Sequence, residues 1–236
     1  KELGLEDIDQ LIDEAEKEEE EGNYQKAIGI VEKILAIEQR ELGLEHQDVA
    51  ETLRWMGYLL TEQEFYVKAE SVYLRALEIY EKTLGPDHVE TLTLLSWLAS
   101  LYYYKGSFSQ AEPLMLGVLS THEKEDVLDD EQYSHLLTQI GYLYDDVGFN
   151  DKAESFYKRS IAINEKSGAD KSELILALYA LSLLYEKQGF KNKAEPIFNR
   201  FLKREEEERG RQLSDLEILN IRLERYLTLR QHPKVI

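Results

Sequence analysis

The sequence predicts an all-α solenoid, in which five helix–turn–helix units stack in a row and a single helix closes the array. One observation is a repeat, because an alanine returns at intervals of 42, 42, 42 and 41 residues. A second observation is that each repeat contains two successive apolar stripes with helical spacing, and the alanine lies in the second of them. Helix pairs of fixed length bury their apolar faces only against neighbouring copies, so they have to stack. The five alanines are Ala27, Ala69, Ala111, Ala153 and Ala194.

The first helix of each repeat is predicted from two positions that hold the same kind of residue in every copy. Every repeat has a leucine 16 residues before its alanine and a small residue 12 residues before it. A small residue lets two helix backbones approach each other closely. The leucines are Leu11, Leu53, Leu95, Leu137 and Leu178, and the small residues are Ala15, Gly57, Ala99, Gly141 and Ser182.

Glycine then ends the first helix in four repeats, as expected of a residue that adopts positive φ at a helix C-terminus. Three repeats continue with an N-cap residue followed by glutamate three positions later, and we expect these pairs to form capping boxes at the start of the second helix. Apolar residues four and eight positions after the alanine predict the buried stripe of that helix. The glycines are Gly22, Gly106, Gly148 and Gly189, and the expected capping boxes are Ser109/Glu112, Asp151/Glu154 and Asn192/Glu195.

This pattern predicts one elongated domain over residues 1–236. The first repeat has Glu14 and Glu18 where the others have apolar residues, so it is expected to act as the N-terminal cap. Beyond the fifth repeat, apolar residues at spacings of three and four predict a capping helix over about 215–230. The predicted repeats are 7–48, 49–90, 91–132, 133–174 and 175–214, and the apolar residues of the capping helix are Leu216, Leu219, Leu223, Tyr226 and Leu227.

Composition excludes several classes of protein. The chain has 28 lysines and arginines against 47 aspartates and glutamates, a net charge of −19. Such a charge repels nucleic acid and anionic membrane surfaces. There is no cysteine for disulfides or thiolate metal sites, no stretch long enough to span a bilayer and no signal peptide at the start. The sequence therefore predicts a soluble, cytoplasmic protein with no nucleic-acid partner and no membrane insertion.

Catalytic motifs are missing as well. The five histidines are scattered, and His46 and His88 occupy the same place in successive repeats, which indicates a structural role. No phosphate-binding glycine loop or nucleophile elbow occurs, and no carboxylate cluster has the spacing of a calcium loop. We expect no enzyme activity, no metal and no cofactor.

The order of small residue, aromatic residue, glycine and alanine resembles the tetratricopeptide repeat, in the 42-residue form found in kinesin light chains. Residues 73–88, YLRALEIYEKTLGPDH, carry this resemblance most clearly, and it covers nearly the whole chain. It implies a right-handed superhelical solenoid whose first helices line a concave groove. It also implies that residues between the packing positions of these helices face the groove, namely Arg54, Trp55, Tyr58, Trp97, Ser100, Tyr103, Tyr104, Gln139, Tyr142, Asp145, Tyr179 and Leu183.

Trp55 and Trp97, the only tryptophans, stand where many tetratricopeptide repeats carry an asparagine that holds the backbone of a bound peptide. Tryptophan supplies instead a flat apolar wall with one N–H donor, so the groove is expected to prefer large apolar or aromatic anchors. Gln139 still offers an amide for a peptide backbone. Packing against a neighbouring helix is an equally open interpretation for Tyr58 and Tyr142, whereas for the tryptophans the groove is favoured over the core.

The function that follows is that of a non-catalytic protein–protein interaction scaffold, which binds a partner peptide or segment in an aromatic-rich groove. Two other interpretations remain open. In one, the solenoid mainly self-associates into a homo-oligomer. In the other, it is the sensor or regulatory arm of a larger multidomain protein.

Overall fold

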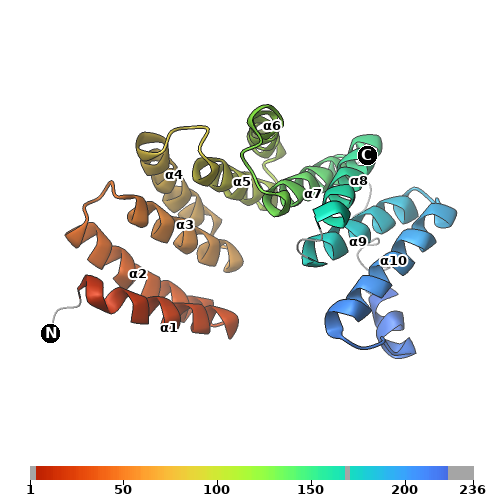
Figure 1. Cartoon of the computed structure of the whole chain (residues 1–236), viewed down its shortest axis with the longest axis horizontal. Coiled ribbons are helices and arrows are strands. Elements are labelled where there is room, and N and C mark those ends of the chain that lie inside the picture. The colour runs from red at the N-terminus through yellow and green to blue at the C-terminus, as the bar shows by residue number, and fades with distance from the viewer. Residues whose placement is uncertain (1–3, 168–170, 223–236) are drawn as a thin grey trace. The chain divides into compact units, whose positions relative to one another are not determined.

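The computed structural model describes residues 4–167 and 171–222, and every regular element in these two ranges is a helix (Figure 1). The predicted all-α fold class is therefore confirmed. The elements are the short 3-10 helix η1 (Leu5–Asp7) and the α-helices α1 (Ile8–Glu20), α2 (Tyr24–Glu41), α3 (Gln47–Glu62), α4 (Tyr66–Thr83), α5 (Val89–Tyr104), α6 (Phe108–Glu125), α7 (Asp130–Asp146), α8 (Asn150–Ser167), α9 (Lys171–Lys187) and α10 (Lys191–Arg209).

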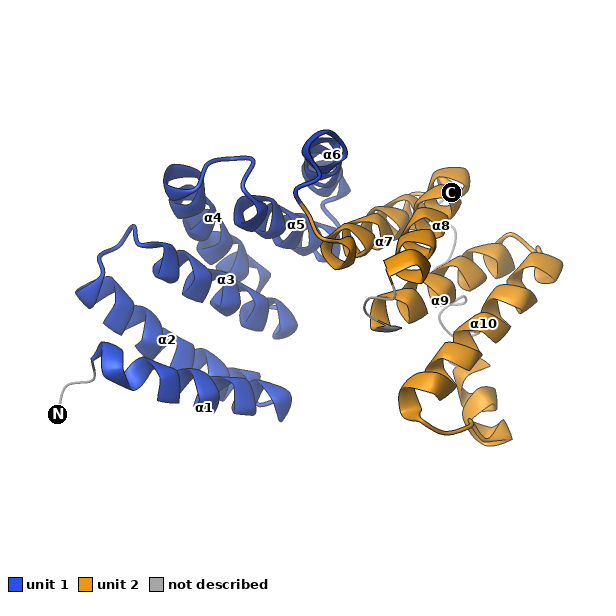
Figure 2. Ribbon diagram, in the orientation of Figure 1, with its two compact units in different colours: residues 1–127 blue, residues 128–236 orange. Residues whose placement is uncertain are grey.

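These helices form two compact units, residues 1–127 and residues 128–236 (Figure 2). Unit 1 contains η1 and α1 to α6, and unit 2 contains α7 to α10. Within each unit, every α-helix packs against the next one along the chain. In addition α3 contacts α5 in unit 1, and α7 contacts α9 in unit 2. The first helices of successive repeats thus lie side by side within a unit. The arrangement of residues 1–236 as one continuous domain stays a prediction.

Small residues allow the helices of a pair to pack closely, as the sequence predicts. A Cβ atom added to Gly57 would lie 2.3 Å from the ring of Tyr73, and one added to Gly141 would lie 2.4 Å from the ring of Tyr157. Both tyrosines belong to the second helix of the same pair and are almost completely buried. The aromatic ring therefore takes the space that a side chain on the first helix would need.

The turns between first and second helices share one hydrogen-bonding pattern. After α7, the Gly148 N–H donates to the carbonyl of Asp145 at 3.1 Å, and the Phe149 N–H donates to the carbonyl of Tyr144 at 2.8 Å. Gly148 has a φ of 82°, and the three other predicted glycines have similar positive values. In the second repeat Glu64 takes this place with a φ of 58°, so a side chain is held in the left-handed region there.

The predicted capping boxes of the second helices are wrong. Helices α6, α8 and α10 begin one residue before Ser109, Asp151 and Asn192, so these residues lie inside the first turn. The residues at the N-caps of α6 and α10, Ser107 and Phe190, accept no side-chain hydrogen bond from the helix. The chain enters these helices directly from the glycine turn, which leaves no room for an extended capping residue.

Side chains do cap several other helices. The Nδ1 atoms of His46 and His88 accept from the backbone N–H groups of Asp48 and Glu90, at 3.2 and 3.3 Å, at the starts of α3 and α5. The repeated histidine therefore has the structural role that the sequence indicates. Asp129 forms a capping box with Gln132 at the start of α7.

Residues 215–222 are helical and follow a capping box in which the Glu217 N–H donates to the Ser214 hydroxyl, while the Ser214 N–H donates to the Glu217 carboxylate. Arg222 reaches back to α10, where its guanidinium lies 3.2 Å from Glu195 and over the ring of Phe198. Leu216 and Leu219 are exposed, so these two leucines do not form the buried stripe expected of the capping helix. Its other predicted apolar residues, Leu223, Tyr226 and Leu227, lie outside the described residues.

Candidate functional site

In unit 1 the sequence-predicted groove residues lie on the adjacent first helices α3 and α5. Arg54, Trp55 and Tyr58 belong to α3, whereas the other four belong to α5. We call the aromatic members of this set, Trp55, Tyr58, Trp97, Tyr103 and Tyr104, the aromatic face of unit 1.

Two contacts hold the centre of the aromatic face. The indole N–H of Trp55 donates to the Glu19 carboxylate of α1 at 2.7 Å. The rings of Tyr58 and Trp97 pack edge to face, with their centroids 5.5 Å apart. Burial and the nearby carboxylates of Glu62 and Glu19 raise the pKa of Tyr58 to about 12. Trp55, Tyr58 and Trp97 are each half-buried, which leaves part of each ring accessible.

The end of α5 adds a second pair of rings. Tyr103 and Tyr104 pack edge to face with centroids 5.6 Å apart, and Tyr104 is 59% exposed. Ser100, by contrast, is buried and donates its hydroxyl to the Ser96 carbonyl in the same helix. Ser100 therefore offers little surface to a partner.

In unit 2, Gln139 belongs to a hydrogen-bonded chain between α7 and α9. Its Nε2 lies 2.7 Å from the Nε2 of His135, whose Nδ1 lies 2.7 Å from the Glu173 carboxylate. Because an amide nitrogen can only donate, the His135 Nε2 accepts and its Nδ1 carries the proton that it donates to Glu173. The carbonyl oxygen of Gln139 is buried and accepts no hydrogen bond. It is thus an acceptor held in place and unused.

The remaining predicted residues of unit 2 are engaged with the fold itself. Tyr142 packs on the buried Tyr157, with centroids 5.6 Å apart, and Tyr179 packs on Phe201 at 5.2 Å. Asp145 accepts from the Lys187 ammonium at 2.9 Å. Leu183 is buried. Of the five predicted residues in this unit, Gln139 is the one that presents an unused hydrogen-bonding atom.

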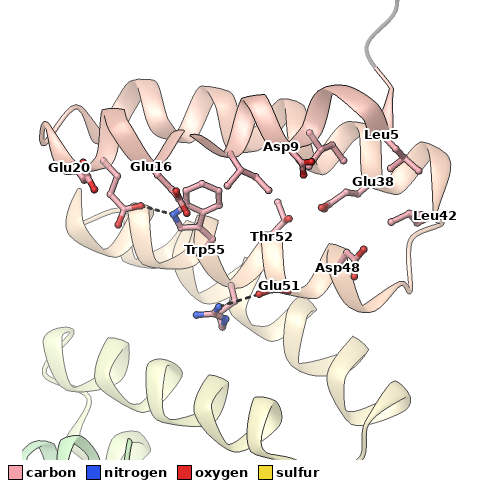
Figure 3. A pocket seen from close by; sticks show the side chains of 14 residues that line it. Leu5, Asp9, Glu16, Glu20, Glu38, Leu42, Asp48, Glu51, Thr52 and Trp55 are labelled. Atoms are coloured by element: carbon pink, nitrogen blue, oxygen red, sulfur yellow. Dashed lines mark hydrogen bonds and ion pairs between the residues drawn. The ribbon is translucent and has the colours of Figure 1, made fainter. Parts of the chain in front are cut away.

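A cavity of about 800 Å³ opens next to the aromatic face, between α1, α2 and α3 of unit 1 (Figure 3). We call it the acidic pocket. Leu5, Ile8, Ile12, Leu42 and Trp55 supply apolar walls, and Arg54 is the cation among the lining residues. Carboxylates dominate the rest of the lining, namely Asp9, Glu16, Glu19, Glu20, Glu38, Asp48 and Glu51.

Glu38 differs from the other carboxylates because it is only 6% exposed. Its side chain shares a hydrogen bond with Thr52, while its buried Oε2 has no hydrogen-bond partner. Burial, reinforced by the negative charges of Asp48 and Glu51, raises the pKa of Glu38 to about 7. A buried carboxylate oxygen without a donor is costly, so this group is poised to receive one.

The sequence reasoning missed the acidic pocket, although the repeat contains a signal for it. The residue eleven positions after the repeat alanine is Glu38, Tyr80, His122 or Asn164 in the first four repeats, and all four side chains are buried. A polar residue that recurs at one position of an otherwise apolar stripe indicates a place where neighbouring helix pairs form hydrogen bonds with each other.

Among the described residues, no three side chains of the metal-binding types are grouped so as to hold a metal ion. In the same part of the chain, no helix combines the length and the apolar character that crossing a membrane requires.

Comparison with known proteins agrees with the helix-pair architecture. Residues 48–119 and residues 134–167 match the tetratricopeptide repeat family. No curated protein matches the sequence.

Similar solved structures include BtubC from P. vanneervenii, which is 21% identical with a TM-score of 0.73 over 88% of this chain and 83% of that one. A protein described as a kinesin light chain from Podosopora anserina, with nearly identical TPR-like repeats, is 18% identical with a TM-score of 0.69 over 86% and 96%. A Rap protein complexed with Competence and Sporulation Factor is 17% identical with a TM-score of 0.74, over 86% of this chain and 55% of the Rap chain. At these identities the likeness concerns the fold. Together with the family matches and the 42-residue spacing, it shows that the chain contains tetratricopeptide repeats and shares the fold of kinesin light chain-like repeat structures.

Proposed function

We propose that the chain is a non-catalytic scaffold that binds a segment of a partner protein across the first helices of its repeats. The observation that carries this proposal is the aromatic face of unit 1, where half-buried rings of α3 and α5 lie together. Aromatic side chains in such a setting are the commonest hot spots of protein interfaces. The similar Rap protein was solved in a complex with Competence and Sporulation Factor, which supports a role of this kind.

In unit 1, the aromatic face would supply the anchor sites for the bound segment. Trp55, Trp97 and Tyr104 would receive a large apolar or aromatic side chain. The indole N–H of Trp55 is already used by Glu19, so the anchor would meet the ring surface instead of a free donor.

The proposal is tested by selecting peptides from a displayed random library on the whole chain, and then measuring their affinity for variants. Trp97→Ala and Tyr104→Ala are expected to weaken binding by about 2 kcal/mol or more, which is roughly 30-fold. Leu74→Ala serves as the matched control, because Leu74 is an exposed apolar residue on the second helix α4.

Tyr104 is the decisive variant, since an exposed ring can be truncated without loss of the fold. Circular dichroism verifies that each variant stays helical. Peptides that bind all four proteins equally well would contradict the proposal.

Self-association is the second candidate function, because the same aromatic face could receive another copy of the chain. Sedimentation of the purified chain over a range of concentrations separates the two. A dimer that Tyr104→Ala converts to a monomer would favour self-association over binding of a different protein.

A further inference from the structure

The acidic pocket of unit 1 combines three features. It is a cavity of about 800 Å³, it has a rim of exposed carboxylates that includes Asp9, Asp48 and Glu51, and it has a buried carboxylate, Glu38, among its lining residues. Figure 3 shows Glu38 and Asp48 pointing into the same space, with Thr52 and Trp55 nearby. Rim charges of one sign raise the local concentration of an oppositely charged ligand.

The side chain of Glu38 is a second, independent indication that the acidic pocket binds a ligand. Its Oε2 is buried and accepts no hydrogen bond, although nearly all buried polar atoms in folded proteins have a partner. Its other carboxylate oxygen is the one left for the hydrogen bond with Thr52. The negative charges of Asp48 and Glu51 further destabilise the ionised form of Glu38.

The chemistry of the missing partner follows from the walls of the pocket. A group that satisfies Oε2 must donate a hydrogen bond and should be positively charged. The apolar side chains of Ile8, Ile12 and Trp55 would cover a hydrocarbon stem. A single free carboxylate oxygen suits the compact ammonium of lysine better than guanidinium, which prefers to bond both oxygens of a carboxylate.

We propose that the acidic pocket binds a lysine side chain of a basic segment in the partner protein, with the ammonium on Glu38 and the stem along the apolar wall. This inference rests on the proposed scaffold function and names the residue type that the partner supplies. The lysine contact in the acidic pocket would add to the contact with the aromatic face, and Trp55 belongs to both surfaces.

The experiment uses the whole chain and a fluorescein-labelled peptide of sequence GLKLKG, compared with the same peptide carrying acetylated lysines. Fluorescence anisotropy gives the affinities. Glu38→Gln keeps the shape of the side chain and removes its charge. Glu32→Gln is the matched control, because Glu32 lies exposed on the same helix, outside the pocket, and the same substitution removes its carboxylate.

We expect the lysine peptide to bind, acetylation to abolish its binding, and Glu38→Gln to weaken it at least about tenfold while Glu32→Gln changes it less than about twofold. Equal weakening by both variants would overturn the proposal in favour of a diffuse charge effect. Binding of the acetylated peptide with unchanged affinity would overturn it too. So would Glu38-dependent binding of Mg²⁺ without binding of the lysine peptide.

Proton release supplies a second readout. With a pKa of about 7, Glu38 is partly protonated in the empty pocket at neutral pH, and a neighbouring ammonium favours its ionised form. Peptide binding at pH 7 should therefore release protons, and the affinity should rise between pH 6 and pH 8. Calorimetry in phosphate and in Tris detects the released protons as a difference in heat. Asp9 of α1 and His46, Asp48 and Glu51 around the start of α3 remain in Glu38→Gln, so the loss of proton release in that variant isolates Glu38.

Failure of this inference can be told from failure of the scaffold proposal. If Tyr104→Ala weakens the library-selected peptides while Glu38→Gln leaves lysine peptides unaffected, the aromatic face stands and the lysine site does not.

Discussion

At the scale of single residues, the small residue of the first helix decides how closely the helices of a pair approach. Gly57 and Gly141 lie against the rings of Tyr73 and Tyr157, whereas Gly117, in the middle of α6, has nothing within 4 Å of the place where a Cβ would be. The same residue type therefore has opposite consequences at different places in the repeat. A glycine in a helix interior lowers stability unless the space beside it is needed.

This contrast makes Gly→Ala a test of the packing. Gly141→Ala is expected to lower the free energy of unfolding by about 1–2 kcal/mol, since overlap with the buried Tyr157 outweighs the roughly 1 kcal/mol gained in helix propensity. Gly117→Ala should instead raise it by about 0.5–1 kcal/mol. Urea unfolding followed by circular dichroism measures both. Two changes of the same sign would show that the ring does not limit the approach of the helices.

At the scale of helices, a tyrosine and a glutamate join successive repeats. The Tyr102 hydroxyl of α5 donates to Glu70 of α4 at 3.0 Å, and the Tyr185 hydroxyl of α9 donates to Glu154 of α8 at 2.9 Å. Glu70 also pairs with Lys105. This lysine and the tyrosine hold the pKa of Glu70 below its usual range. Glu154, which was expected to cap its own helix, thus bonds to the next repeat instead.

Removing the hydroxyl tests this connection. Tyr102→Phe and Tyr185→Phe should each lower the free energy of unfolding by about 1.5–3 kcal/mol, the range for a hydrogen bond to a charged acceptor. Tyr104→Phe is the control, because the ring of Tyr104 is 59% exposed, and its effect should stay below about 0.5 kcal/mol. Thermal and urea unfolding give the three values. Equal effects in all three variants would count against a special role for the bond between repeats.

At the scale of the whole molecule, both ends of a repeat array have to protect their last apolar layer. In unit 2 this layer lies on α10, where Phe198 and Phe201 are buried and Arg222 covers the ring of Phe198. The capping box of Ser214 and Glu217 starts the helical segment that carries Arg222. The helical segment 215–222 is therefore expected to act as the C-terminal cap of the repeat array.

Truncation tests the cap. A chain ending at residue 214 should expose Phe198 and form aggregates at micromolar concentration, whereas a chain ending at residue 222 keeps Arg222 and should aggregate less than the shorter chain. Sedimentation velocity and the thermal midpoint of unfolding compare the three chains. If the shorter one stays monomeric and equally stable, the segment is no cap.

The sequence by itself determined the repeat, the pairing of helices and the all-α class, because these depend on local periodicity. The spacing of alanine, leucine and glycine along 42 residues reports which face of each helix is buried and where the first helix ends. It also placed the tryptophans on adjacent first helices, where the structure has them half-buried. The use of that surface for partner binding is still a proposal.

The tertiary structure decided which side chains meet across repeats. The bond between Tyr185 and Glu154, the contact between Tyr58 and Trp97, and the pocket around Glu38 all join residues from different helix pairs. Their geometry depends on how one pair crosses the next, which a linear pattern does not contain. For the same reason Glu154, which was expected to cap its own helix, bonds to Tyr185 instead. A glutamate side chain can reach either its own helix or the next repeat, and only the packing of the repeats brings the tyrosine hydroxyl within its reach.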